Sequence, residues 1–195
     1  MTDPLSPDNR FALAPDLPVP EDDGAADHLA GTTLPSVALP ATGGSTVNLA
    51  DLSGRTVVFA YPKTGDPEKG VPDGWNTIPG ARGCTPQACA FRDLMADFAR
   101  HDVRVFGLST QGTDYQQEVT ARLHLPYPLL SDDGLMLADS LGLPTFAFEG
   151  ETLLRRLTMV IDDSVITSVF YPVFPPDRNA PDVLAWLDAN PRGNR

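Results

Sequence analysis

The sequence is poor in the residues on which metal, nucleic-acid and membrane sites depend. It has three histidines and two cysteines, and no histidine stands at a ligand spacing from the cysteine pair, so a zinc site with four ligands is not expected. Its 26 acidic residues outnumber 14 basic ones and give a net charge of -12. That charge argues against binding nucleic acid or an anionic membrane, and no apolar run is long enough to cross a bilayer.

The first residues of the chain also lack a targeting pattern. Residues 1–9 contain no basic stretch followed by an apolar run, so no secretory signal is expected and the protein is expected in the cytoplasm. Cytoplasmic cysteines are more often reactive thiols than permanent disulfides. The two cysteines are therefore candidates for redox chemistry, and we expect neither a bound cofactor nor a metal.

Length and patterning predict one domain with an extension. Residues 1–33 are rich in Pro, Asp and Ala without periodicity, which predicts an extended N-terminal arm, either loosely attached or laid across the domain. The domain is expected over residues 34–195. Its expected strands are 36–39, 45–49, 55–61, 103–108, 129–130, 153–161 and 165–171, and its expected helices are 85–100, 113–123, 135–141 and 181–190. Strands that alternate with helices and end in a hairpin predict an α/β fold with a mixed central sheet flanked by helices.

A long loop and a helix start surround the first cysteine. The loop, residues 63–83, has no regular pattern, and loops of this length are uncommon and often functional. At the expected helix start, Thr85 suits the N-cap and Pro86 suits the first helical position. Cys84 thus lies where the loop enters the helix, among backbone N–H groups that stabilise negative charge. A thiolate is the reactive form of cysteine, so this position favours a nucleophile, and Arg82 could add positive charge.

The spacing of the two cysteines constrains any disulfide between them. Cys89 follows Cys84 by five positions in the same expected helix, which places their Cα atoms about 8.7 Å apart on opposing sides of the axis. A disulfide tolerates at most about 7 Å. The helical form is therefore expected to be the dithiol, and a Cys84–Cys89 disulfide would require the first turns of the helix to unwind.

At this point the sequence resembles the peroxiredoxin Q (bacterioferritin comigratory protein) family, over residues 34–187. The matching motifs are residues 59–63 (Phe-Ala-Tyr-Pro-Lys), 83–93 (Gly-Cys-Thr-Pro-Gln-Ala-Cys-Ala-Phe-Arg-Asp), 105–109 (Val-Phe-Gly-Leu-Ser), 129–132 (Leu-Leu-Ser-Asp) and 156–162 (Arg-Leu-Thr-Met-Val-Ile-Asp). The paired cysteines in a Phe-Arg-Asp context are the specific part. The resemblance implies a thioredoxin-like fold and a thiol-dependent peroxidase.

The resemblance also implies roles for site residues. Cys84 would attack peroxide and become a sulfenic acid, Cys89 would condense with it to an intramolecular disulfide, and a thioredoxin-type dithiol would restore both thiols. Arg156 would hold the thiolate and the peroxide oxygens by charge-assisted hydrogen bonds. In an alternating strand Arg156 and its neighbour Arg155 face opposite sides, so at most one of them serves. Pro62 would shield the thiolate from water.

The family's threonine is displaced in this chain. The family places a threonine three residues before the reactive cysteine, with its hydroxyl toward the peroxide, but here Ala81 stands three residues before Cys84. The 63–83 loop is longer than its counterpart in the family. Thr77 is the preferred candidate for the hydroxyl, and Thr64 and Thr85 are the alternatives.

The insertion affects the proline as well. Pro62 is the preferred shield, but residues 78–81 (Ile-Pro-Gly-Ala) resemble another peroxiredoxin branch, in which Pro79 would take that role. A second departure is Gln87, where the family often has Glu.

Two other functions are compatible with a reactive cysteine pair. One is a thiol–disulfide oxidoreductase or redox sensor with little peroxidase turnover, although such proteins usually carry Cys-x-x-Cys. The other is a non-catalytic binding module that uses the 63–83 loop and the N-terminal arm. For the peroxidase we expect a monomer or homodimer, with access narrowed by the loop and the arm in favour of small peroxides.

Overall fold

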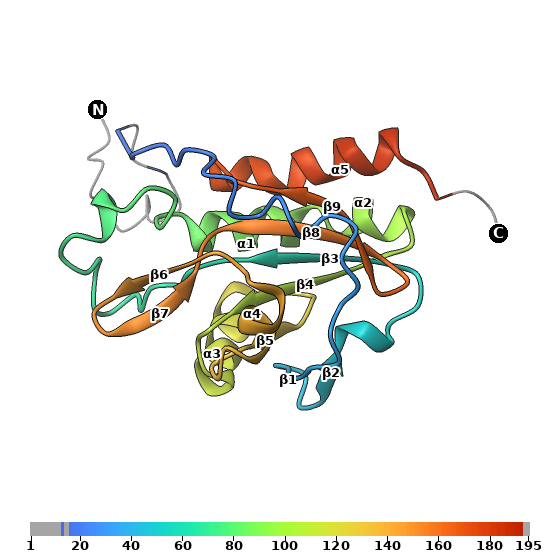
Figure 1. Ribbon diagram of the computed structural model, residues 1–195. Coiled ribbons are helices and arrows are strands. Elements are labelled where there is room, and N and C mark those ends of the chain that lie inside the picture. Colours follow the sequence, from blue (N-terminus) through green and yellow to red (C-terminus); the bar gives the residue numbers. More distant parts are fainter. Residues whose placement is uncertain (1–12, 14–15, 193–195) are drawn as a thin grey trace.

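A five-stranded mixed sheet forms the centre of the molecule in the computed structural model, which describes residue 13 and residues 16–192 (Figure 1). The strand order is β5 (Leu129–Ser131), β4 (Val103–Ser109), β3 (Arg55–Ala60), β8 (Leu157–Asp162) and β9 (Val165–Phe170). The first three strands are parallel to one another, and β8 and β9 each pair antiparallel. Two further antiparallel pairs are β1 (Ala38–Pro40) with β2 (Thr46–Asn48) and β6 (Thr145–Phe148) with β7 (Glu151–Leu154).

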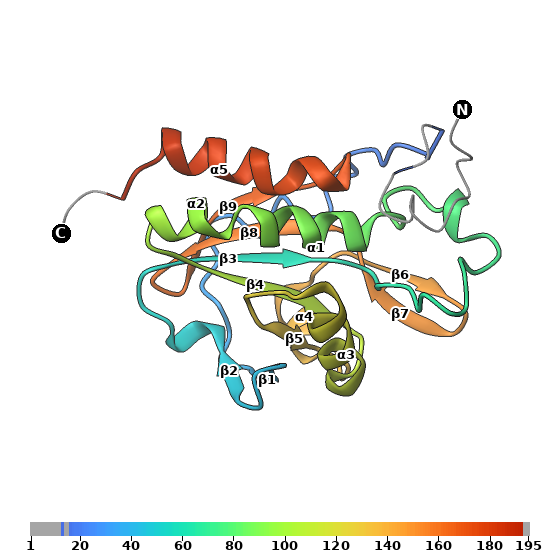
Figure 2. The same cartoon turned by 180° about the vertical axis from the view of Figure 1, so that it is seen from behind.

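Helices cover both faces of this sheet. They are α1 (Cys84–Asp93), α2 (Met95–Arg100), α3 (Thr113–Leu123), α4 (Met136–Leu141) and α5 (Asn179–Ala189), with single 3₁₀ turns at Leu49–Asp51, Trp75–Thr77 and Pro176–Arg178. Apolar residues of α1, α2, α3 and α5 share one buried cluster, whereas α4 and the β1–β2 hairpin belong to the cluster on the other face. Figure 2 shows α5 and α1 running along one side of β3, with the hairpin on the opposite side. Within the described residues, no helix has the length and apolarity that a membrane span requires.

Strand β3 lies at the centre of the sheet because it places apolar side chains on both faces. All six of its residues are buried. Val58 and Ala60 point into one cluster, and Val57 and Phe59 point into the other, as expected of a strand covered on both faces. The prediction of an α/β fold with a mixed sheet flanked by helices is confirmed, and most expected elements lie within two residues of the observed ones.

The expected single helix over residues 85–100 was wrong in two respects. The helix begins one residue earlier, with Gly83 as N-cap at φ 104°, and it breaks at Leu94 into α1 and α2. A Cβ on Gly83 would lie 2.7 Å from Pro176 Cγ, so the close approach of Pro176 requires glycine at this position. Gly83 is therefore the N-cap in place of the expected Thr85. The break keeps Phe91 and Phe98 on the same buried cluster.

The expected strand over residues 153–161 was also wrong, because it is two strands. The first part, β7, pairs with the unpredicted β6, and the second part, β8, pairs with β3. The chain leaves one sheet and enters the other at Arg155 and Arg156. The apolar pattern continues through the change of partner, so sequence periodicity did not reveal it.

The described part of the N-terminal arm lies across the edge of the central sheet. Gly31 N–H donates to Ile166 O (2.7 Å), and Leu34 N–H donates to Ser164 O (2.8 Å). Leu29 is fully buried in the cluster that contains α4. These contacts cover the edge strand β9, which would otherwise expose unpaired backbone groups. The arm's first residues lie outside the described residues.

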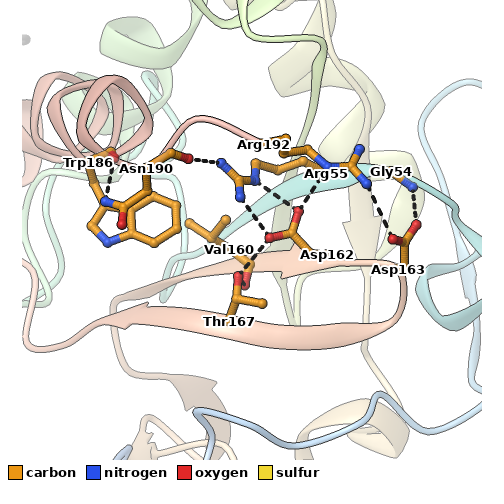
Figure 3. A network of polar contacts seen from close by, with 9 residues as sticks. All are labelled: Gly54, Arg55, Val160, Asp162, Asp163, Thr167, Trp186, Asn190 and Arg192. Atoms are coloured by element: carbon orange, nitrogen blue, oxygen red, sulfur yellow. Dashed lines mark hydrogen bonds and ion pairs between the residues drawn. The ribbon is translucent and has the colours of Figure 1, made fainter. Parts of the chain in front are cut away.

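A polar network ties the C-terminal segment to the end of the sheet where β3 begins (Figure 3). Arg55 binds both carboxylate oxygens of Asp162 (2.9 and 2.8 Å) and donates to Asn190 O (2.6 Å). Arg192 adds ion pairs with Asp162 and Asp163. Partial burial alone would raise the pKa of Asp162, but the hydrogen bonds from Arg55 hold it below its usual range. The network fixes the end of the sheet opposite to the loop that carries Cys84.

Candidate active site

Cys84 is the first residue of α1. The sequence predicted that it lies where the loop enters the helix. The chain leaves the carboxyl end of β3, makes the 63–83 excursion (Figure 1) and turns at Gly83 into the helix. The first backbone bond of the helix runs from Gln87 N–H to Gly83 O (3.0 Å). Cys84 therefore stands at the N-terminal end of the helix, where the helix dipole favours negative charge, and its Sγ lies 3.6 Å from Ala81 O.

Arg156 is the cation that contacts Cys84. Its terminal nitrogen lies 3.2 Å from Cys84 Sγ, and both residues are almost fully buried, at 3% and 4% exposure. The same guanidinium donates to the carbonyl oxygens of Gly80 (3.3 Å), Ala81 (3.2 Å) and Arg82 (3.3 Å). The residues just before Cys84 thus hold Arg156 in place, and Arg156 in turn is directed at the sulfur. A buried, charge-assisted hydrogen bond of this kind stabilises a thiolate.

Its neighbour Arg155 points elsewhere. The Arg155 guanidinium lies 6.0 Å from the centre of the Phe146 ring, so only one of the two arginines reaches the cysteine, as the sequence argument required. We expected the alternation of a strand to turn the two arginines to opposite sides. Instead, neither arginine lies in a strand.

Gln87 is a site residue to which sequence reasoning assigned no role. It is fully buried on α1, accepts a hydrogen bond from Arg156 and donates one to Asn179 Oδ1 (2.8 Å). Its position three residues after Cys84 places it on the same side of the helix. That spacing was the available signal, but its partners come from the segment between β7 and β8 and from α5, far away in the sequence.

A cavity of about 1030 Å³ opens beside Cys84. Its walls include Thr64, Trp75 and Leu153, so the 63–83 loop and β7 contribute alongside the helix start. Hydrogen peroxide needs far less room than this. The loop therefore borders a large space beside the sulfur, and the expectation of access narrowed in favour of small peroxides stays a prediction.

The structure does not bring Thr77 to the cysteine. Thr77 is exposed, is not among the residues that line the cavity, and donates its hydroxyl to Gly74 O (2.7 Å) within a 3₁₀ turn. Thr64 is buried, lines the cavity and donates to Gln111 Oε1 (3.1 Å). Thr85 also lines the cavity. Two of the three candidate hydroxyls therefore share the cavity with Cys84.

The candidate prolines lie on another side of the site. Pro62 is buried and, with the exposed Pro79, borders a small hollow against Arg156. Neither proline is among the residues that line the Cys84 cavity, whereas Pro86 is. Pro62 thus borders Arg156, and Pro86 shares the cavity with Cys84.

Cys89 lies on the same helix as a second free thiol. It is half-buried, and this burial raises the pKa of its thiol, an effect that the nearby Arg92 partly opposes. Both cysteines belong to the intact helix α1. Five positions apart in a helix, their Cα atoms are too far from each other for a disulfide. The structure therefore corresponds to the reduced, helical state. In the described part of the chain, no three His, Cys, Asp or Glu side chains gather as a metal site.

The two thiols should differ in their reaction with iodoacetamide. Cys84 borders the cavity and contacts Arg156, whereas the raised pKa of Cys89 leaves less thiolate at neutral pH. We expect Cys84 to be alkylated first at neutral pH, and Cys89 to react as the pH rises toward its pKa. Single-cysteine variants, Cys84→Ser and Cys89→Ser, followed by mass spectrometry, isolate each rate. Equal rates at neutral pH would contradict the assignment.

Comparisons with known proteins point to one family. The Redoxin family matches residues 29–187. The chain is 29% identical to "Peroxiredoxin Q, chloroplastic" of Sedum lineare over 178 residues, which is 90% of this chain and 87% of that protein. It is 30% identical to the Populus jackii protein of the same name, covering 82% and 68%. The crystal structure of peroxidoxin BcpB from Mycobacterium tuberculosis, 30% identical, superposes with a TM-score of 0.67 over 84% of this chain and 98% of that one.

Proposed function

Since this chain belongs to the redoxin family as a peroxiredoxin of the Q (bacterioferritin comigratory protein) type, it is a thiol-dependent peroxidase with a thioredoxin-like fold, and we propose that Cys84 is the thiol that peroxide oxidises. The observation that carries this proposal is the 3.2 Å contact between Arg156 and Cys84 Sγ at the wall of a cavity. The thiolate attacks one peroxide oxygen, the O–O bond breaks, and the other oxygen leaves with a proton as water or an alcohol. The sulfur becomes a sulfenic acid.

Arg156 serves this step through its contact with the sulfur. Its N–H groups stabilise the thiolate before attack. For the hydroxyl that completes the site we propose Thr64 in place of Thr77. Its burial, its place in the cavity and the fixed hydrogen bond to Gln111 favour it.

Cys89 is proposed to resolve the sulfenic acid. Its sulfur attacks Cys84 Sγ, a water leaves, and a disulfide forms within one chain. This requires α1 to unwind between the two cysteines. The hydroxyl of Tyr127, whose pKa is raised by burial and which therefore stays protonated, donates to Ala88 O (2.6 Å) and holds the helix in its folded form. Its release is part of the expected rearrangement.

A dithiol of the thioredoxin type is the proposed reductant. Its two thiols exchange with the Cys84–Cys89 disulfide, so the dithiol becomes oxidised and both cysteines become thiols again. We propose that this cycle takes place in the cytoplasm, in a monomer or homodimer. The two plant relatives named above are described as chloroplastic.

Replacing Cys89 by serine tests the division of roles. The Cys89→Ser protein should consume one equivalent of peroxide at close to the normal rate, because Cys84, Arg156 and the cavity are intact. It should then stall as a sulfenic acid, with thioredoxin-dependent turnover lowered by at least about a hundredfold. A sulfenic-acid trap such as dimedone, read by mass spectrometry, detects the product. Sustained turnover with thioredoxin would exclude Cys89 as the resolving thiol.

A further inference from the structure

Gln87 connects the reactive cysteine's helix to the arginine that activates it. Its side-chain oxygen accepts from Arg156, and its side-chain nitrogen donates to Asn179 Oδ1 (2.8 Å). Gln87, Arg156 and Asn179 are each at most 3% exposed. Water therefore cannot replace either contact, and losing one would leave a buried polar group without a partner.

The orientation of the Gln87 amide is set by the residues behind it. Thr158 Oγ1 donates to Asn179 Oδ1 (2.7 Å), the same oxygen that accepts from Gln87. An amide oxygen has no hydrogen and can only accept, so the group of Gln87 that faces Asn179 Oδ1 must be the nitrogen. The oxygen of Gln87 must then face Arg156.

Arg156 forms no ion pair with a carboxylate anywhere in the described residues. Its partners are three backbone carbonyl oxygens, the amide oxygen of Gln87 and Cys84 Sγ. All of these except the sulfur are neutral acceptors. A buried cation without a counter-ion is unfavourable, so the state in which Cys84 is a thiolate relieves that cost.

We propose that Gln87 is a positioning residue that holds Arg156 without neutralising it, so that the Cys84 thiolate is the only anion within the described residues that contacts Arg156. This inference rests on the proposed function. A carboxylate at position 87 would bind the same nitrogen and compete with the thiolate for the charge. Because Gln87 lies between the two cysteines, its contacts with Arg156 and Asn179 must also break when α1 unwinds, and a neutral amide releases an arginine more readily than a carboxylate does.

Other titratable groups around the sulfur do not supply the competing charge. Burial raises the pKa of Tyr61 at the end of β3, so its hydroxyl stays neutral. The basic residues that line the cavity are Lys63, Lys69, Arg82 and Arg122. The acidic residues that line the cavity, none of which bonds to Arg156, are Asp66, Asp133, Glu149 and Glu151.

The test is Gln87→Glu, which changes the charge at nearly constant shape. We expect the second-order rate with hydrogen peroxide to fall by about tenfold or more, and the pH profile of iodoacetamide alkylation at Cys84 to move to higher pH. Gln117→Glu, which adds the same charge at an exposed position of α3, should leave both unchanged. The Cys89→Ser background isolates the reaction of Cys84.

Gln87→Met separates charge from shape. It removes the hydrogen bond but adds no carboxylate, so we expect a severalfold slower peroxide reaction with an unshifted alkylation profile. Equal profile shifts in Gln87→Glu and Gln87→Met would overturn the proposal, because they would indicate a structural role alone. If Gln87→Glu fails to fold, an unchanged peroxide rate in Gln87→Met overturns it, and a slowed rate with an unshifted profile supports it. Cys84→Ser must be inactive in either case, since its activity would instead contradict the proposed function.

Discussion

Replacing Cys84 by serine should lower thioredoxin-dependent peroxide turnover by at least about a thousandfold. A serine hydroxyl does not ionise near neutral pH, so Arg156 would face a neutral, weakly nucleophilic oxygen in place of a thiolate. Serine is close to cysteine in shape, and the fold should persist. Peroxide-dependent oxidation of reduced thioredoxin measures the loss.

The matched control for this variant is Cys89→Ser, which also loses a thiol from α1. It should keep the first, stoichiometric reaction with peroxide that Cys84→Ser lacks. If Cys84→Ser retained full turnover, or if the two variants lost the first reaction equally, Cys84 would not be the peroxide-reactive residue.

Replacing Arg156 by methionine should slow the peroxide reaction of Cys84 by about a hundredfold, similar to the loss of one preorganised donor to a developing anion. The variant loses the 3.2 Å contact with Cys84 Sγ and the donors to the carbonyl oxygens of Ala81 and Arg82. Stopped-flow measurement of the first reaction reports the rate.

Arg155→Met is the control for Arg156→Met. It removes a neighbouring positive charge that packs on Phe146 and does not touch the site, so its rate should be close to that of the unchanged protein. Arg156→Lys should recover only part of the rate, because an ammonium cannot hold the carbonyl oxygens and the sulfur with one planar group. Equal losses in Arg155→Met and Arg156→Met would mean that overall charge, and not this contact, accounts for the effect.

The local part of the site could be predicted from sequence because it depends on neighbouring residues. Cys84 follows a loop and precedes a helical pattern, and five positions separate it from Cys89. Helix geometry alone then excludes a disulfide in the folded helix. Arg156 lies 72 positions from Cys84, and only the family resemblance could select it over Arg155.

The missed parts depend on how distant segments meet. Thr77 is nearer to Cys84 in sequence than Thr64 is, but its hydroxyl closes a surface turn with Gly74. Thr64 follows directly from the end of β3 and therefore stays beside the helix start. The role of Gln87 depends on partners from the segment between β7 and β8 and from α5, which no local pattern could bring to it.

The break at Arg155 and Arg156 has the same origin. Two short strands with a continuous apolar pattern look like one, and only pairing with β6 on one side and β3 on the other separates them. This break frees Arg156 from the alternation of a strand. It can then turn toward the carbonyl oxygens that precede Cys84.

Peptide mapping after one equivalent of peroxide tests the central claim most directly. Cleavage after Arg82 and Arg92 places both cysteines in one tryptic peptide, residues 83–92. We predict that this peptide becomes lighter by two hydrogens, remains a single peptide under non-reducing conditions and resists alkylation, as an internal Cys84–Cys89 disulfide requires. A disulfide-linked pair of these peptides from two chains, or two alkylatable thiols after the peroxide has been consumed, would contradict the account.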